Sequence, residues 1–126
     1  MRFLIVDDSA TMRRILVNSL QRIGFAECVE AEDGREALRK FDASVGFVIT
    51  DWNMPHMSGV DFARALRALP SGSSVPVLMV TGRGTREDVA VAAAGVVNAC
   101  IVKPFTPQAL KEKIEQVRSS ASALAS

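Results

Sequence analysis

The feature that most constrains the fold is a series of five short apolar runs, separated by longer segments with helical periodicity. Four runs are continuously apolar, whereas the second contains a glutamate. Strands of a parallel sheet that is covered on both faces lack polar alternation, so the four runs indicate such a sheet and the second run an edge strand. We therefore predict strands at "FLIV" (3–6), "CVEA" (28–31), "GFVIT" (46–50), "PVLMV" (76–80) and "ACIV" (99–102).

The segments between the runs carry helix start and stop signals. A first helix with a regular apolar stripe is expected to end near Gly24. Three further helix starts have the spacing or composition of N-terminal caps: Asp33 with Glu36, Ser58 with Asp61, and Thr106 with Pro107. One more helix is expected to begin near Thr85, although its sequence would also suit a strand. Strand and helix thus alternate five times, which predicts an α/β domain with a doubly wound, five-stranded parallel sheet.

Length and charge narrow the class of protein. The chain has 126 residues, of which 48% are hydrophobic, and this suits one domain. A formal net charge of +1 lacks the excess of positive charge that nucleic-acid binding requires. We find no signal peptide and no apolar stretch of membrane-spanning length, and we expect a cytoplasmic protein without membrane insertion. Residues 1–118 are expected to form the domain, and the Ser/Ala-rich segment 119–126 to be a helical or disordered tail with no output domain.

Polar residues follow four of the five predicted strands. Asp7 and Asp8 follow the first, Asp51 the third, Thr81 the fourth and Lys103 the fifth. Because the carboxyl ends of parallel strands share one edge of a sheet, we expect these side chains to converge there, where such sheets bind ligands. Any one of these aspartates alone would be interpreted as a helix cap or a loop residue. The combination of acids, a hydroxyl and a lysine instead favours a functional cluster.

The predicted cluster has a definite chemistry. Two carboxylates about 4 Å apart repel by roughly 4 kcal/mol at an effective dielectric near 20, and one lysine does not compensate three acids. Mg²⁺ suits such a site because it prefers carboxylates, waters and phosphate oxygens. Lys103 and Thr81 would contact a phosphate as a point charge and a hydroxyl donor. Asp51, central in the cluster, is the candidate nucleophile that takes a phosphoryl group as an acyl phosphate.

Four segments carry a family resemblance: "FLIVDDSATMRRIL", "FVITDWNMP", "VLMVTG" and "IVKPF". They resemble the receiver domain of two-component response regulators, most closely the single-domain chemotaxis type, from Phe3 to the last helix. The resemblance implies the flavodoxin-like (βα)5 receiver fold with strand order 2-1-3-4-5 and a cis Lys103–Pro104 bond. It also implies that Asp51 is phosphorylated and that Mg²⁺ is bound directly by Asp8 and Asp51, largely through water by Asp7, and by the backbone carbonyl of Asn53.

The resemblance further implies a switch and partner surface. Thr81 and Lys103 would bind phosphoryl oxygens, and Thr81 would move toward them. Cys100 stands where the family usually has Tyr or Phe, and Arg83 stands where the chemotaxis type often has an acid. Thr81, Cys100 and Arg83 are the residues that we assign to this surface. Because Cys100 lacks an aromatic ring, signal output is expected to differ from that of the family, and Arg83 would contact the phosphoryl group or restrict water. The cysteines Cys28 and Cys100 lack metal-ligand spacing and are interpreted first as packing residues.

The function that the sequence predicts is a monomeric, single-domain response regulator of a chemotaxis-type phosphorelay, not an enzyme that acts on a separate substrate. A histidine kinase would be the phosphodonor, and a flagellar motor switch protein or a phosphatase a phosphorylation-dependent partner. An alternative is a phosphate sink or a kinase-side regulator without motor output. An aspartyl-phosphate enzyme would want an acid two residues after the nucleophile, where this chain has Asn53. A pure interaction module is disfavoured by the intact cluster.

Overall fold

The computed structural model describes residues 1–82 and 96–125. Arg83 and the helix expected near Thr85 lie outside these residues. The sheet has five parallel strands in the order β2-β1-β3-β4-β5, which confirms the predicted order and places β2 at an edge. All five predicted strands are present, with ends within one residue of expectation: β1 (Arg2–Val6), β2 (Cys28–Ala31), β3 (Val45–Asp51), β4 (Val77–Thr81) and β5 (Ala99–Val102).

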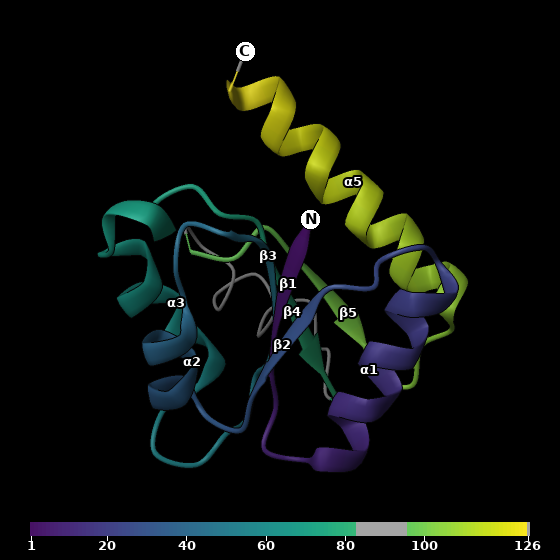
Figure 1. The fold of residues 1–126 in the computed structure, drawn as a ribbon, viewed down its shortest axis with the longest axis horizontal. Helices are drawn as coiled ribbons and strands as arrows, with labels where there is room; N and C mark the ends of the chain where they lie inside the picture. The colour runs from purple at the N-terminus through teal and green to yellow at the C-terminus, as the bar shows by residue number, and fades with distance from the viewer. Residues whose placement is uncertain (83–95, 126) are drawn as a thin grey trace.

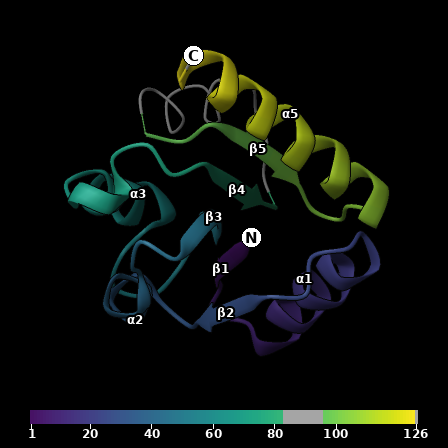
Figure 2. The same cartoon turned by 45° about the horizontal axis from the view of Figure 1, so that its top comes forward.

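Helices cover both faces of this sheet. Figure 1 shows α2 and α3 on one side of the strands and α1 and α5 on the other, and the turned view in Figure 2 agrees. This is the doubly wound arrangement that the apolar runs predict. The helical segments are α1 (Ala10–Arg22), α2 (Gly34–Lys40), α3 (Gly59–Arg67), the short 3-10 helix η1 (Pro70–Gly72) and α5 (Pro107–Ala125).

The helix starts form as local capping chemistry dictates. The side chains of Asp33, Ser58 and Thr106 each accept a hydrogen bond from the backbone N–H three residues later, at 2.8, 3.1 and 3.0 Å. Such a bond satisfies one of the amide donors that have no partner inside the helix. Gly24 follows the end of α1 with a φ of +100°, a conformation that glycine adopts without strain. The sequence signals for these helix ends are therefore confirmed.

Two apolar layers hold the sheet between the helices. Alternate residues of each central strand point to opposite faces, so Leu4 and Val6 join one core cluster and Phe3 and Ile5 join the other. All four of these side chains are fully buried. Burial of such a side chain contributes about 1.5–3 kcal/mol, which explains why residues 3–6 of β1 are apolar without alternation.

The last helix continues beyond the domain boundary expected from the sequence. Its buried stripe of Leu110, Ile114 and Val117 packs on the sheet, as predicted. The backbone remains helical through Ala125, and in Figure 1 this end of α5 projects past the strands. Of the two forms expected for the tail, the structure shows the helical one for residues 119–125. Among the described residues, no helix combines the length and apolar character that crossing a membrane requires.

Candidate functional site

Three aspartates meet at the carboxyl edge of the sheet. Asp7 directly follows β1, Asp8 comes next, and Asp51 is the last residue of the neighbouring strand β3. Each offers a carboxylate oxygen, and these oxygens all lie within 4.8 Å of one another. Asp7 is 1% exposed and Asp51 is 9% exposed, whereas Asp8 is open to solvent. The predicted convergence is confirmed for these three aspartates.

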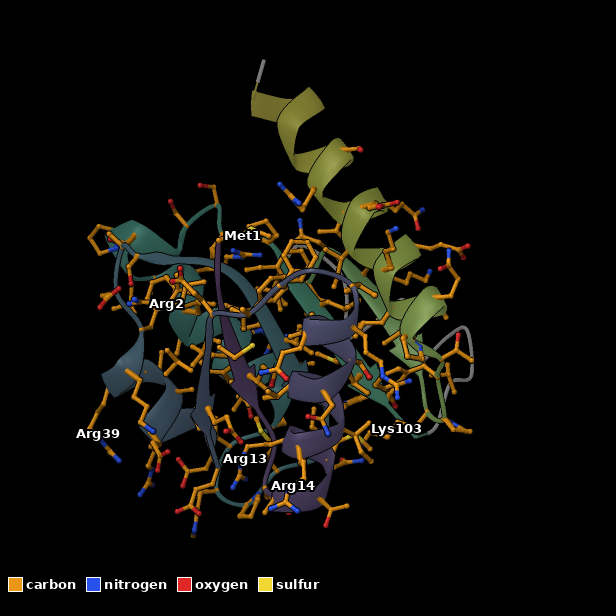
Figure 3. The ribbon with its side chains drawn as sticks, turned by 45° about the vertical axis from the view of Figure 1, so that its right-hand side comes forward. Met1, Arg2, Arg13, Arg14, Arg39 and Lys103 are labelled. Carbon is orange, nitrogen blue, oxygen red and sulfur yellow. The ribbon has the colours of Figure 1, made fainter. Side chains whose placement is uncertain are left out.

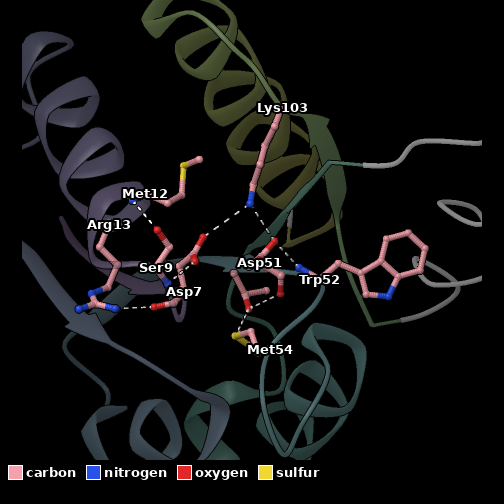
Figure 4. A network of polar contacts seen from close by, with 9 residues as sticks. Asp7, Ser9, Met12, Arg13, Asp51, Trp52, Met54 and Lys103 are labelled. Atoms are coloured by element: carbon pink, nitrogen blue, oxygen red, sulfur yellow. Dashed lines mark hydrogen bonds and ion pairs between the residues drawn. The ribbon is translucent and has the colours of Figure 1, made fainter.

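Lys103 reaches this cluster from the far edge of the sheet. Its Nζ lies 3.2 Å from Asp51 Oδ1 and 3.8 Å from Asp7 Oδ2, as drawn in Figure 4. Its backbone N–H donates to the carbonyl of Thr81 at 2.8 Å, which ties the end of β5 to the end of β4. The Lys103–Pro104 bond is cis, as the resemblance implies. The ammonium group thus pairs with two of the three carboxylates.

The carboxylate of Asp7 is buried and only partly compensated. Its Oδ1 accepts a hydrogen bond from the Ser9 N–H at 2.9 Å, but its buried Oδ2 has no hydrogen-bond partner in the described part of the chain. Burial raises the pKa of Asp7, the Ser9 N–H and Lys103 lower it, and the charges of Asp51 and Asp8 raise it further. A buried oxygen without a donor, inside a set of hard oxygen ligands, fits a divalent cation such as Mg²⁺.

Asp51 is held by its own strand end and by the start of α3. Its Oδ1 accepts from the Trp52 N–H at 2.9 Å as well as from Lys103. Gly59 N–H donates to the Trp52 carbonyl at 2.7 Å, and a Cβ at Gly59 would lie only 2.3 Å from the Asp51 carbonyl oxygen. Position 59 therefore requires glycine, a packing constraint that the local sequence does not reveal.

The remaining predicted residues that the structure describes differ in burial and in their position in the sheet. Thr81 is buried at the end of β4, beside the crossing Lys103 backbone. Asn53 is exposed in the loop after β3. Cys100 is half-buried within β5, where it pairs in register with Met79 and packs against the core cluster on the α2 and α3 side. Burial raises the pKa of the Cys100 thiol, in agreement with its interpretation as a packing residue.

Sequence reasoning missed Arg13. Its Nη1 donates to the Asp7 carbonyl oxygen at 2.6 Å, and its Nε lies 3.2 Å from Glu30 Oε1 on β2. A signal was available in the sequence, because Arg13 and Arg14 fall near the N-terminal end of a helix, where positive charge opposes the helix dipole. A positive charge at such a position calls for a nearby hydrogen-bond acceptor. For Arg13 that acceptor is the backbone carbonyl of Asp7, a residue of the acid cluster.

Comparisons with known proteins agree with this geometry. Residues 3–115 match the response regulator receiver domain. The chain is 49% identical over 119 residues to the chemotaxis protein CheY1 of Helicobacter pylori, which covers 93% of this chain and 96% of the relative. It is 49% identical over 118 residues to CheY of Pseudomonas aeruginosa, covering 93% and 95%.

Solved structures give the same result. The chemotaxis response regulator CheY4 of Vibrio cholerae superposes with a TM-score of 0.83 at 34% identity, over 92% of this chain and 97% of that chain. A response regulator receiver domain protein of Clostridium thermocellum superposes with a TM-score of 0.85 at 28% identity, over 98% of both chains. The family match, the relatives and the shared fold agree, and the chain therefore belongs to the response regulator receiver domain family as a CheY-like member.

Proposed function

We propose that this protein is a single-domain response regulator of a chemotaxis-type phosphorelay, phosphorylated on Asp51 by a histidine kinase in the presence of Mg²⁺. The observation that carries the proposal is the position of Asp51 Oδ1, 3.2 Å from Lys103 Nζ and beside two further carboxylates. In this proposal residues 1–118 form the receiver domain, and 119–126 are a tail. The protein acts in the cytoplasm as a monomer.

The environments of the three aspartates favour Asp51 as the acceptor. Asp7 is 1% exposed and its Oδ1 is engaged by the Ser9 N–H, so an incoming phosphoryl group has little access to it. Asp8 is exposed and suits a metal ligand at the rim. Asp51 lies in hydrogen-bond contact with the Lys103 ammonium, which offsets charge on a transferred group. In the transfer, a carboxylate oxygen of Asp51 forms the new bond to phosphorus as the bond to the donor's histidine nitrogen breaks.

The acid cluster supports a magnesium site in this proposal. Asp8 and Asp51 would hold the ion directly, Asp7 largely through water, and Asn53 through its backbone carbonyl. When bound, Mg²⁺ neutralises phosphoryl oxygens during transfer. The buried Oδ2 of Asp7 supports this assignment, because it accepts no hydrogen bond from the described residues and the Lys103 ammonium, 3.8 Å away, is the one cation paired with it there.

Thr81 and Lys103 complete the site as contacts to the phosphoryl group. Thr81 lies at the end of β4, between the strands that carry Asp51 and Lys103. A phosphoryl group on Asp51 would compete for the Lys103 ammonium that the bare carboxylate now holds. This exchange of partners is a charge-driven change of the kind that switches receiver-type proteins. The phosphorylated form would then bind a flagellar motor switch protein or a phosphatase.

One observation favours a second candidate, a phosphate sink or kinase-side regulator without motor output. Cys100 is half-buried on β5 and occupies the position of the usual aromatic residue. A thiol is too small to act as a bulky two-position element, so coupling between Asp51 and a partner surface is expected to be weak. Pull-down of a flagellar motor switch protein with and without a beryllium fluoride adduct separates the two: dependence on the adduct supports motor output, and its absence supports the sink.

Labelling of Asp51 tests the main proposal. Wild-type protein incubated with radiolabelled acetyl phosphate and Mg²⁺ is expected to retain label, and Asp51→Asn is expected to retain none, because the amide is not a nucleophile of this kind. Asp61→Asn is the matched control, since it makes the same exchange at an exposed position on α3. Undiminished labelling of Asp51→Asn contradicts the assignment, catalytic release of phosphate without retained label indicates an enzyme, and no label on the wild type indicates an interaction module.

A further inference from the structure

Arg13 joins three elements at the acid cluster. It belongs to α1, its guanidinium donates to the Asp7 carbonyl after β1, and it pairs with Glu30 on β2. Its side chain is only 17% exposed although it carries a full charge. Figure 3 shows it at the carboxyl edge of the sheet, and the close view in Figure 4 shows it beside Asp7. The contacts place a partly buried cation next to the aspartates, and its partners among the described residues are the Asp7 carbonyl and Glu30 rather than a carboxylate of the cluster.

These contacts fix the peptide that links Asp7 to Asp8. The Asp7 carbonyl and the Asp8 amide belong to one rigid planar unit, so a hydrogen bond of 2.6 Å to the carbonyl restrains the whole unit. The preceding peptide is restrained as well, because the Asp7 N–H donates to the Ala31 carbonyl at 3.1 Å. Asp8 itself is exposed, so its direction depends largely on this backbone.

We propose that Arg13 is a positioning residue for the metal site, which sets the direction of Asp8 through the Asp7 carbonyl. This inference rests on the proposed function, in which Asp8 is a direct ligand of Mg²⁺. Glu30 contributes by holding the guanidinium at Nε, which leaves Nη1 aimed at the carbonyl. The guanidinium reaches the Asp7 carbonyl and the Glu30 carboxylate at once, because Nη1 and Nε are separate donors. A lysine ammonium has only one nitrogen for these two acceptors.

The charge of Arg13 and its geometry have opposite effects on metal binding. A nearby positive charge repels Mg²⁺. If Arg13 acts only through its charge, its removal therefore tightens Mg²⁺ binding. If Arg13 orients a metal ligand, its removal weakens Mg²⁺ binding, because loss of a group that orients a ligand commonly lowers metal affinity about tenfold or more. The sign of the change therefore separates the two roles.

The experiment is a Mg²⁺ titration followed by the fluorescence of Trp52, the single tryptophan of the chain and the neighbour of Asp51. Arg13→Ala is expected to raise the Kd for Mg²⁺ about tenfold. Arg14→Ala is the matched control, because it removes the same charge from the next position of α1, where the side chain is exposed. It is expected to leave the Kd unchanged or slightly lower. Urea unfolding of each variant verifies that the titrations are made on folded protein.

The outcomes are distinguishable from a failure of the proposed function. If the wild type binds Mg²⁺ and Asp8→Asn loses binding, the site is established independently of Arg13. An unchanged or lowered Kd in Arg13→Ala then overturns the positioning role alone. If Arg13→Ala does not fold, Arg13→Lys is titrated instead, since it keeps the charge and loses the fork. A raised Kd in that variant supports the proposal, and a wild-type Kd overturns it.

Discussion

Replacement of Asp7 by asparagine is expected to stabilise the metal-free protein. Asp7 is 1% exposed, its Oδ2 has no hydrogen bond among the described residues, and two carboxylates lie close by. Asparagine has nearly the same shape and can still accept the Ser9 N–H through its side-chain carbonyl. The substitution therefore removes repulsion and keeps the local hydrogen bond.

The size of the effect follows from the distances. Two unit charges 4.8 Å apart, the outer limit of the cluster, repel by about 3.5 kcal/mol at an effective dielectric near 20. Asp7 has two such neighbours. The Lys103 ammonium, 3.8 Å from Asp7 Oδ2, attracts this carboxylate by about 4.4 kcal/mol at the same effective dielectric, and this attraction offsets part of the repulsion. Because water screens the exposed Asp8 further, we expect a net gain of about 1–2 kcal/mol in the free energy of unfolding.

The gain depends on pH with a definite sign. The pKa of Asp7 is raised above its ordinary value of 3.8 because the folded state buries it and surrounds it with negative charge. The folded state thus holds a proton more tightly than the unfolded state, and the wild type loses stability as pH rises through the raised pKa. The advantage of Asp7→Asn is therefore full at neutral pH and declines as pH falls toward 3.8.

Urea unfolding at neutral pH with a chelator measures the gain. Glu27→Gln is the matched control, because it makes the same kind of exchange at a side chain that is 66% exposed, and its effect is expected to stay within about 0.5 kcal/mol. Added Mg²⁺ should stabilise the wild type by mass action more than Asp7→Asn, so the difference should narrow. A variant that is no more stable than the wild type without metal would refute the electrostatic argument.

Two further substitutions test the lysine and the switch position. Lys103→Met should tighten Mg²⁺ binding, because it removes a competing cation, yet slow labelling of Asp51 by acetyl phosphate by about a hundredfold; weaker metal binding in the Trp52 titration would contradict the charge argument. Cys100→Tyr should raise the ratio of partner affinities between the beryllium fluoride adduct and the unmodified protein, measured by titration with the motor switch protein. A wild-type ratio that is already large and unaltered by the substitution would contradict this idea.

The fold was predictable because its determinants are local. The apolar runs identify β1, β3, β4 and β5 as strands with two covered faces, and the glutamate in β2 identifies an edge. Cap residues such as Asp33 and Ser58 act within one helical turn, so their spacing is visible in the sequence. Gly59 was not predictable, since its requirement arises from contact with the Asp51 carbonyl, eight positions earlier.

The sequence predicts which residues meet at the site, but not how deeply each is buried or which groups it contacts. Parallel strands bring Asp7, Asp8 and Asp51 to one edge whatever their exact contacts. The sequence cannot show that Asp7 is buried while Asp8 is exposed, because that contrast depends on which side of the chain faces the sheet edge. Nor can it show that Arg13 selects the backbone of Asp7 in preference to a carboxylate.

The strand order explains why a lysine completes the cluster. Asp51 and Lys103 are carried by β3 and β5, which are two strand spacings apart, about 10 Å. The contact of 3.2 Å between them requires the lysine side chain to span the end of β4, the strand that lies between β3 and β5. Among residues 1–82 and 96–125, Lys103 is the one cation that pairs with Asp51, so a shift of β5 relative to β3 would change the distance between ammonium and carboxylate directly. The ion pair therefore links β5, the strand that holds Cys100, directly to the carboxylate of Asp51.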